Sequence, residues 1–249
     1  MRIALLSDIH GNLAALEAVV ADARRRGVDE FINLGDSLSG PLMPLETAQF
    51  LMDQGWITLA GNHERQLLTP SPRGREPSDD YAFAQLSTRE LHWLRSLPAV
   101  YQYAEDIFLC HGTPVSDTQY WLETVESTGL RMAHMQEIEQ RAAGRIDALM
   151  ACGHTHLPRV VRMPSGQRIV NPGSVGLPAY DDVHPYLHYV ETASPDARYA
   201  VIERVGPSWI VDLIAVPYNH FAMANLAARN GRPDWQYALA TGYALRVAS

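Results

Sequence analysis

The chain has 249 residues, of which 47% are hydrophobic and 19% charged, and this composition predicts a globular protein and excludes a disordered one. The formal net charge of −8 argues against a groove for long nucleic acids as the main function. No apolar run suits a membrane span, no secretory leader is visible, and two cysteines cannot build a disulfide framework, so we expect a cytoplasmic protein.

The first part of the chain alternates strands with helices. Apolar runs predict strands over residues 3–6, 31–34 and 56–59, and helical periodicity predicts helices over 13–26 and 41–54. This βαβαβ order favours parallel strands joined by right-handed crossovers.

The rest of the chain is expected to be more varied. A proline-rich loop is predicted over 69–80, followed by helices over 79–86 and 88–97 and strands over 100–103 and 107–110. The remaining predicted elements are helices over 120–129 and 131–143, a strand over 146–151, a hairpin of 159–163 with 168–170, strands over 197–204 and 209–216, and helices over 219–230 and 233–239. Because the α/β order precedes antiparallel strands, we expect two packed sheets with helices outside.

Metal-binding residue types follow the predicted strands in groups, and each group lies at or within one residue of a glycine. They are Asp8, His10, Asp36, Asn62, His63, His111, His154 and His156. In open α/β sheets, ligands bind beyond the carboxyl ends of the strands, so these side chains should meet if the strands share an edge. The mixture of carboxylate, amide and imidazole suits Mn, Fe or Zn better than Ca or Mg, and it is too large for one tetrahedral zinc. We therefore expect two divalent transition-metal ions, with Ni or Co as further candidates.

Taken together, five short blocks carry a family resemblance. They are Asp8-x-His10, Gly35-Asp36, Gly61-Asn62-His63-Glu64, His111-Gly112 and Gly153-His154-Thr155-His156. In this order they resemble the calcineurin-like metallophosphoesterases from residue 1 to about residue 174. The turn at residues 171–174 (Asn-Pro-Gly-Ser) is similar to the small bacterial and archaeal branch that includes the YfcE-like phosphodiesterases.

The resemblance implies a fold and a domain organisation. The expected fold is α/β, a four-layer α-β-β-α sandwich of two mixed β-sheets flanked by helices. We expect a single domain over 1–249, with a motif core over 1–174 and C-terminal strands and helices over 186–242 completing the sandwich.

The resemblance also implies the role of each residue. Asp8, His10 and His156 would hold one metal, Asn62, His111 and His154 the other, Asp36 would bridge both, and His63 would face the leaving-group oxygen. Two divalent ions and two carboxylates leave the site at about +2, which attracts phosphate. A hydroxide shared by the metals would attack, and His63 would protonate the departing alkoxide.

Two positions depart from the family pattern. Ser39 stands where an aspartate orienting the catalytic histidine is common, and Gly40 stands where a phosphate-binding arginine is common. Candidate replacements for that arginine are Arg73, Arg75 and Arg159.

Other residues receive simpler interpretations. Cys110 and Cys152 are read as buried apolar residues, although Cys152 could also be a third soft ligand, and Glu64 is read as the start of a helix. The remaining histidines, read as packing or surface residues, are His92, His134, His184, His188 and His220.

The predicted function is hydrolysis of phosphate esters, most simply a phosphodiesterase or phosphatase acting on small nucleotide-like substrates. The alternatives are a protein phosphatase acting on phosphoserine or phosphothreonine and a non-catalytic metal-binding scaffold of the same fold. We expect a small-molecule phosphoester as partner, no nucleic-acid polymer and no membrane, while an oligomer is allowed.

Overall fold

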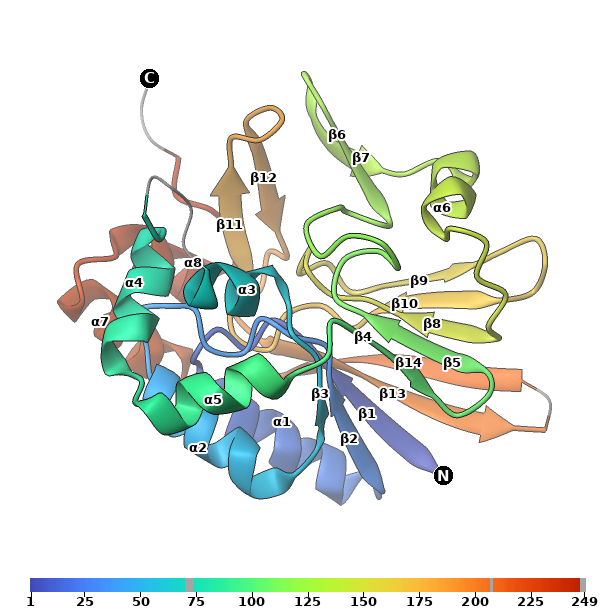
Figure 1. The fold of residues 1–249 in the computed structure, drawn as a ribbon. Helices are drawn as coiled ribbons and strands as arrows, with labels where there is room; N and C mark the ends of the chain where they lie inside the picture. Colours follow the sequence, from blue (N-terminus) through green and yellow to red (C-terminus); the bar gives the residue numbers. More distant parts are fainter. Residues whose placement is uncertain (70–73, 207, 247–249) are drawn as a thin grey trace.

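The computed structural model describes residues 1–69, 74–206 and 208–246 (Figure 1). Its first sheet has the strand order β14-β13-β1-β2-β3. Three parallel strands form one part, namely β1 (Arg2–Leu6), β2 (Glu30–Asn33) and β3 (Ile57–Thr58). On the other side of β1, β13 (Ala197–Val205) and β14 (Ser208–Val216) add antiparallel strands from the C-terminal part of the chain.

The second sheet has the order β4-β5-β8-β10-β9. Its strands are β4 (Val100–Tyr103), β5 (Ile107–Cys110), β8 (Leu149–Ala151), β10 (Arg168–Asn171) and β9 (Arg159–Arg162). The central three, β5, β8 and β10, are parallel, and the two outer strands are antiparallel to their neighbours. Both sheets are therefore mixed, as predicted.

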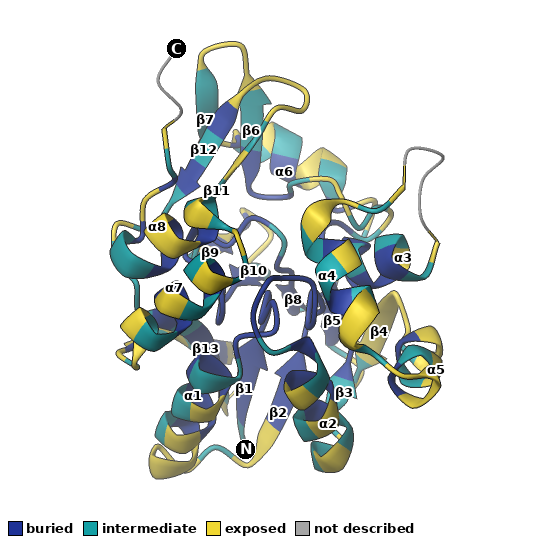
Figure 2. Cartoon of the chain, turned by 90° about the vertical axis from the view of Figure 1, so that its left-hand side faces the viewer, coloured by how far each residue is buried: buried dark blue, intermediate teal, exposed yellow. Residues whose placement is uncertain are grey.

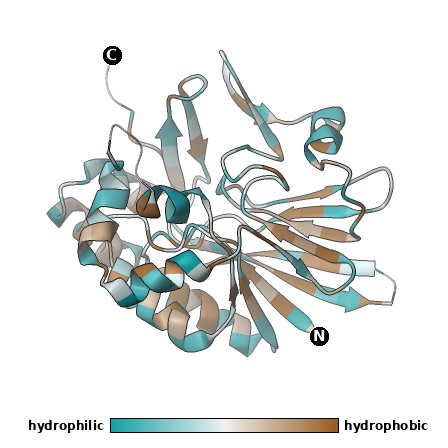
Figure 3. Ribbon diagram, viewed as in Figure 1, coloured by the Kyte–Doolittle hydropathy of each residue, from teal (hydrophilic) through white to brown (hydrophobic). Residues whose placement is uncertain are grey.

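Alternate residues of β1 face two different cores. Ile3 and Leu5 pack between the sheets against Leu109 and Leu149, whereas Ala4 and Leu6 pack against the helices on the outer face. Because side chains of a strand alternate between its two faces, a strand that is buried on both faces must be apolar throughout. Figure 3 accordingly shows hydrophobic colour along the central strands of both sheets.

Helices cover the outer faces and complete the predicted four layers (Figure 1). On the first sheet lie α1 (Leu13–Arg25) and α2 (Pro44–Gln54). Against α2 and one another pack α3 (Asn62–Leu68), α4 (Pro77–Gln85) and α5 (Thr88–Ser96). Packed on the second sheet is α6 (Met135–Arg141), while α7 (His220–Arg229) and α8 (Pro233–Thr241) pack on one another beside α1. The Asn12 side chain accepts the Ala15 N–H at 3.1 Å and caps α1, as its position before the apolar pattern indicates.

The prediction of helices over 120–129 and 131–143 is wrong for most of its length. Residues there form an antiparallel hairpin of β6 (Glu123–Glu126) and β7 (Gly129–Met132), and only α6 is helical. Thr124 and Val125 are β-branched, and Gly129 has φ +119°, a backbone conformation that an α-helix does not contain. The backbone preferences of these residues therefore favour a β-hairpin over the predicted helices.

Two further differences shape the site. A second hairpin, β11 (Ala179–Asp182) with β12 (His188–Glu191), lies where no element was predicted. The helix α4 begins at Pro77, inside the segment predicted as a loop over 69–80, because Pro at a first helical position needs no N–H partner. The expectation of one domain over 1–249 stays a prediction, although β13 pairs with β1 along residues 197–205.

The carboxyl ends of β1, β2, β3, β5 and β8 open on the same side of the molecule. The connecting loops there are buried at the centre of Figure 2, between α8 on one side and α3 and α4 on the other, with the two hairpins above. None of the helices among the described residues is long and apolar enough to cross a membrane.

Candidate metal centre

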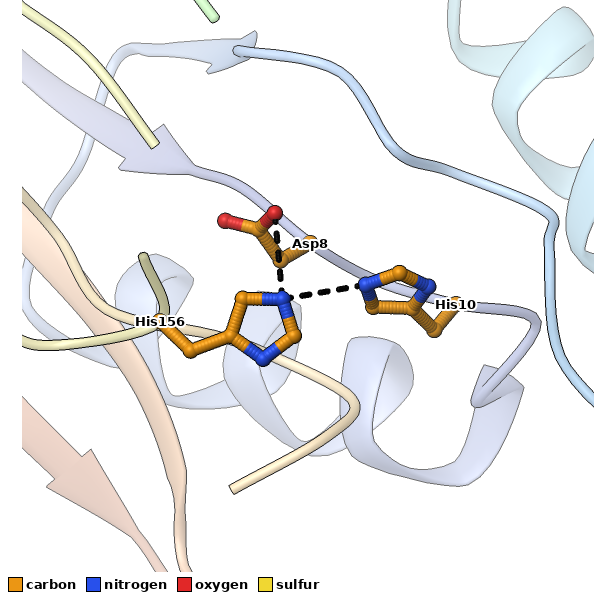
Figure 4. Close-up of side chains that lie close together, drawn as sticks. All are labelled: Asp8, His10 and His156. Atoms are coloured by element: carbon orange, nitrogen blue, oxygen red, sulfur yellow. Dashed lines mark hydrogen bonds and ion pairs between the residues drawn. The ribbon is translucent and has the colours of Figure 1, made fainter. Parts of the chain in front are cut away.

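The first cluster joins the loop after β1 to the loop after β8. Its members, Asp8, His10 and His156, point toward one another in Figure 4. His10 Nε2 lies 3.1 Å from His156 Nε2, which lies 3.3 Å from Asp8 Oδ1. The Nδ1–H groups donate at 2.7 Å to main-chain carbonyls, that of His10 to Ser39 and that of His156 to Leu177. Each Nε2 is then left with a lone pair, and two lone pairs that face each other need a positive charge between them.

A second cluster lies beside the first and consists of Asp36, His111 and His154. His111 Nδ1–H donates to the Leu34 carbonyl at 2.9 Å, and its Nε2 lies 3.0 Å from Asp36 Oδ2. His154 Nε2–H donates to the Thr118 carbonyl at 3.0 Å, so its Nδ1 carries the lone pair. A main-chain carbonyl thus fixes the tautomer of each of the four imidazoles, which is the usual support of a metal-binding histidine.

Several buried polar atoms at the same place have no hydrogen-bond partner. They include Asp8 Oδ1, Asn62 Oδ1 and His111 Nε2, while the Asn62 amide donates to Gln66 Oε1 at 3.3 Å and so turns its oxygen the other way. A buried polar atom without a partner costs about 1–3 kcal/mol. Cations at the two clusters would satisfy all three atoms, and the residues present therefore fit a pair of metal ions.

The protonation states of the histidines at the site are also compatible with bound metal ions. Burial and the neighbouring His156 lower the pKa of His10 to about 3, and burial and His111 lower the pKa of His154 to about 4, so both are neutral at pH 7. Burial would also lower the pKa of His111, but the carboxylate of Asp36 raises it to about 10. The Asp36 carboxylate favours a positive charge beside it, and a bound metal cation can supply that charge in place of the proton on His111.

The backbone at the site is strained where the ligands lie. Non-glycine residues with positive φ include Asp8 (56°), His10 (52°), Asp36 (54°), His154 (67°) and His156 (57°). Each such conformation costs about 1 kcal/mol or more. Gly11 and Gly35 have positive φ beside His10 and Asp36, as predicted, and the ligands adopt such conformations as well. Gly61 and Gly153 instead provide room, because a Cβ there would overlap with Asp36 Oδ1 and Ser7 Oγ, respectively.

Glu64 holds two of these loops together. Its buried carboxylate accepts the main-chain N–H groups of Asp36 at 2.9 Å, Ser37 at 2.8 Å and Gly61 at 2.7 Å. Burial and the charge of Asp36 raise the pKa of Glu64. The interpretation of Glu64 as a residue that only begins a helix is therefore incomplete. Glu64 follows Gly61 by three residues, which is the spacing of a capping box, and this spacing could have indicated its hydrogen bond to the Gly61 N–H.

His63 faces the same space from the start of α3. Its Nδ1 lies 2.9 Å from Asp79 Oδ1, and its main-chain N–H donates to Asp36 Oδ1 at 2.9 Å. Burial would lower the pKa of His63, but the carboxylates of Asp36 and Asp79 raise it to about 9. Asp79, which is fully buried on α4, thus occupies the position relative to the histidine that was expected for residue 39. No short-range sequence signal joins residues 63 and 79.

A cavity of about 590 Å³ opens above both clusters. Its floor includes His10, Asp36, Asn62, His63, His154 and His156. Its wall is formed by the beginning of α4, the β11–β12 hairpin, Tyr120 and Trp235 of α8. The cavity also includes His184, which was read as a packing or surface residue, whereas His188 is buried and packs against Tyr120.

The two candidate arginines that the structure describes do not line this cavity. Arg73 lies outside the described residues. Arg75 donates to the Leu67 carbonyl at 2.8 Å and stacks on Phe83, and Arg159 pairs with Glu123 at 2.8 Å. Because the described pair is engaged elsewhere and absent from the cavity lining, we do not retain it as a phosphate clamp.

Comparisons with known proteins show the family and the fold of the chain. The family model of the calcineurin-like phosphoesterase superfamily domain matches residues 1–193. An uncharacterized protein of Methanocaldococcus jannaschii is 24% identical over 260 residues, covering 94% of each chain. A metallophosphoesterase from Sphaerobacter thermophilus is 25% identical, with a TM-score of 0.74 over 97% of this chain and 99% of its own. A hypothetical protein of Pyrococcus horikoshii has the same fold, with 18% identity, a TM-score of 0.72 and 99% coverage of each chain.

Proposed function

The chain belongs to the calcineurin-like phosphoesterase superfamily and is a metal-dependent phosphoesterase, and from this premise we propose that it hydrolyses small-molecule phosphate esters with two divalent cations bound above its sheets. The superfamily predicted from the five blocks is thereby confirmed. The number of cations, the role of each residue and the substrate are our proposal.

The proposed ligand sets follow the two clusters. Asp8, His10 and His156 would hold one cation. His111 and His154 would hold the other together with the Asn62 amide oxygen, and Asp36 would bridge both cations. When bound, such cations polarise the phosphate and activate the attacking water. The candidate metals are Mn, Fe and Zn, followed by Ni and Co, because the donors mix nitrogen with oxygen.

His63 is the proposed general acid. Its Nδ1–H donates to Asp79, so the ring is held with Nε2 available to the leaving-group oxygen. Asp79 acts as a positioning residue: it holds the ring orientation and stabilises the imidazolium that carries the transferred proton. The proton moves from His63 Nε2 to the alkoxide as the ester bond breaks.

One observation carries the proposal. Four imidazoles from three separate loops each donate one N–H to a main-chain carbonyl and turn the other nitrogen toward a common centre. Hydrogen bonding within the protein leaves His111 Nε2 and the Asn62 oxygen without partners and brings His10 Nε2 within 3.1 Å of His156 Nε2, and bound cations would satisfy all of these atoms.

The test uses the purified chain reconstituted separately with Mn, Fe, Zn, Co and Ni. Bis-p-nitrophenyl phosphate and p-nitrophenyl phosphate separate diester from monoester hydrolysis, and metal analysis gives the stoichiometry. We expect metal-dependent turnover with two metals per chain, lost in His156→Ala and kept in His92→Ala, an exposed histidine outside the site. No turnover with any of the five metals would overturn the proposal.

The alternative functions have separate outcomes. Turnover restricted to phosphoserine or phosphothreonine peptides would identify a protein phosphatase. Metal binding without any hydrolysis would identify a scaffold. A preference for nucleotide-like esters, the oligomeric state and a cytoplasmic location stay predictions.

A further inference from the structure

Among the described residues, the charged side chains on the cavity wall are carboxylates. They are Glu76 at the beginning of α4 and Asp181 and Asp182 on β11. The wall also includes His184. Glu76 and Asp181 are exposed, and Asp182 is half-buried. They stand above a centre that would attract anions, so the wall and the floor favour opposite charges.

Among the residues that the structure describes, no arginine lines this wall. The sequence contains no lysine, so arginine is the remaining permanent cation. Neighbouring arginines of the described chain are committed: Arg65 pairs with Asp117 at 2.6 Å, and Arg232 pairs with Asp234 at 2.6 Å and donates to Ser78 Oγ at 2.7 Å. Neither lines this cavity.

Three aromatic rings complete the wall. Trp235 lies edge-on to His10, Tyr180 to His156 and Tyr120 to His154, with ring centroids 5.8, 4.7 and 5.1 Å apart. The hydroxyl groups of Tyr120 and Tyr180 are 2.8 Å apart, which joins two sides of the wall. Aromatic rings next to carboxylates are the usual surroundings of a bound organic cation.

We infer that the preferred substrate is a phosphoester with a single phosphate group whose organic part carries a positive charge, such as an amino alcohol or a quaternary ammonium alcohol. The inference rests on the proposed function, because the cations would hold the phosphate. Asn62 Oδ1, buried and without a partner at the floor, marks where a cation that holds the phosphate would lie.

The arrangement also discriminates against polyphosphates. Additional phosphate groups would extend from the floor toward the carboxylates of the wall, with no described arginine to pair with them. Like charges brought together in a partly enclosed site repel, and this lowers binding. A substrate with a cationic end meets attraction at both ends of the cavity.

The experiment compares three p-nitrophenyl phosphodiesters of similar size. One carries choline, one carries 3,3-dimethylbutanol, its uncharged isostere, and one carries 3-hydroxypropanoate, which is anionic. The leaving group is the same throughout, so a difference in kcat/KM reports the wall. We expect the choline ester to exceed the isostere by about tenfold and the anionic ester to be slowest.

A charge-removing variant tests where the preference arises. Glu76→Gln, Asp181→Asn and Asp182→Asn together keep the side-chain shapes, and we expect the choline-to-isostere ratio to fall to about one. The matched control is Asp53→Asn, Glu139→Gln and Asp212→Asn, which removes three exposed carboxylates outside the cavity. It should keep the wild-type ratio.

The outcomes are separable. Equal kcat/KM for the three esters overturns this inference and leaves the proposed function intact. A preference that persists in the wall variant, or that disappears in the control, also overturns it. If none of the three esters is hydrolysed, this inference is overturned; if bis-p-nitrophenyl phosphate and p-nitrophenyl phosphate are not hydrolysed either, the proposed function is overturned with it.

Discussion

The floor and the wall of the cavity are built in opposite ways. The floor is built mainly from buried side chains on strained loops. Its metal-binding histidines each use one ring nitrogen to donate a hydrogen bond to a main-chain carbonyl, such as that of Leu34 or Ser39. The wall comes from a hairpin, a helix start and scattered aromatic residues, and several of its side chains are exposed. A fixed floor retains one chemistry, whereas an adaptable wall can select the substrate without disturbing that chemistry.

Removal of the metals should produce the largest effect because the whole floor depends on them. With chelator, we expect kcat to fall about a thousandfold or more for every ester, since several kcal/mol of transition-state stabilisation are lost. The thermal midpoint should also fall, because Asp8 and Asp36 lose their counter-charge. Ester hydrolysis and differential scanning calorimetry, before and after metal is returned, measure both effects. If the metal-free protein kept its turnover, the chemistry would not depend on metals at the floor, and the distinction between floor and wall would be wrong.

His63→Ala should give the next largest effect, and this effect should depend on the leaving group. We expect kcat to fall about 10²–10⁴-fold for alkyl esters, whose alkoxides need a proton, and far less for p-nitrophenyl esters. The measurement is a plot of kcat against leaving-group pKa, with metal content determined in parallel. Equal losses for both ester classes would show that His63 does not supply the proton.

Asp79→Asn should have a smaller effect of the same kind. The ring of His63 keeps an oxygen partner but loses the charge beside Nδ1, so we expect kcat for alkyl esters to fall about tenfold with little change in KM. Asp80→Asn, one position along and exposed, is the matched control and should behave as wild type. The leaving-group plot should steepen in Asp79→Asn alone. If both variants match wild type, Asp79 does not position His63.

Asp22 lies on α1, away from floor and wall, and should affect stability alone. It accepts hydrogen bonds from Arg26 at 2.6 Å and Tyr199 at 2.8 Å. Although burial raises its pKa, the hydrogen bonds from Arg26 and Tyr199 and the charge of Arg26 together outweigh this and lower the pKa below 3.8. Its stabilisation is therefore present above pH 3.8 and is lost as pH falls through the folded-state pKa.

The expected result for Asp22→Asn is a loss of about 1 kcal/mol in the free energy of unfolding at pH 7, shrinking below pH 3.8. Urea unfolding at a series of pH values measures it. Turnover should stay at the wild-type value. A stability difference that is constant across the series would show that the Asp22 charge contributes nothing.

The sequence by itself determined the floor. Asp8 and Asp36 lie within three residues of the ends of the neighbouring parallel strands β1 and β2, and His111 and His154 lie within three residues of the ends of β5 and β8 in the other sheet. The proximity within each pair therefore follows from local patterns, whereas packing of the two sheets brings the pairs together. The sequence did not show that the ligands themselves would adopt the strained backbone.

Tertiary structure decided the wall and the partner of His63. Asp79 reaches His63 because α4 packs on α3, and residues 179–191 become a hairpin beside the cavity despite their weak strand pattern. The error over residues 120–132 is different, because β6 and β7 are neighbours in the chain and their hairpin follows local backbone preference. The partner of His63 and the position of the β11–β12 hairpin depend on packing between segments that are distant in the chain, and the pattern within each segment does not record it.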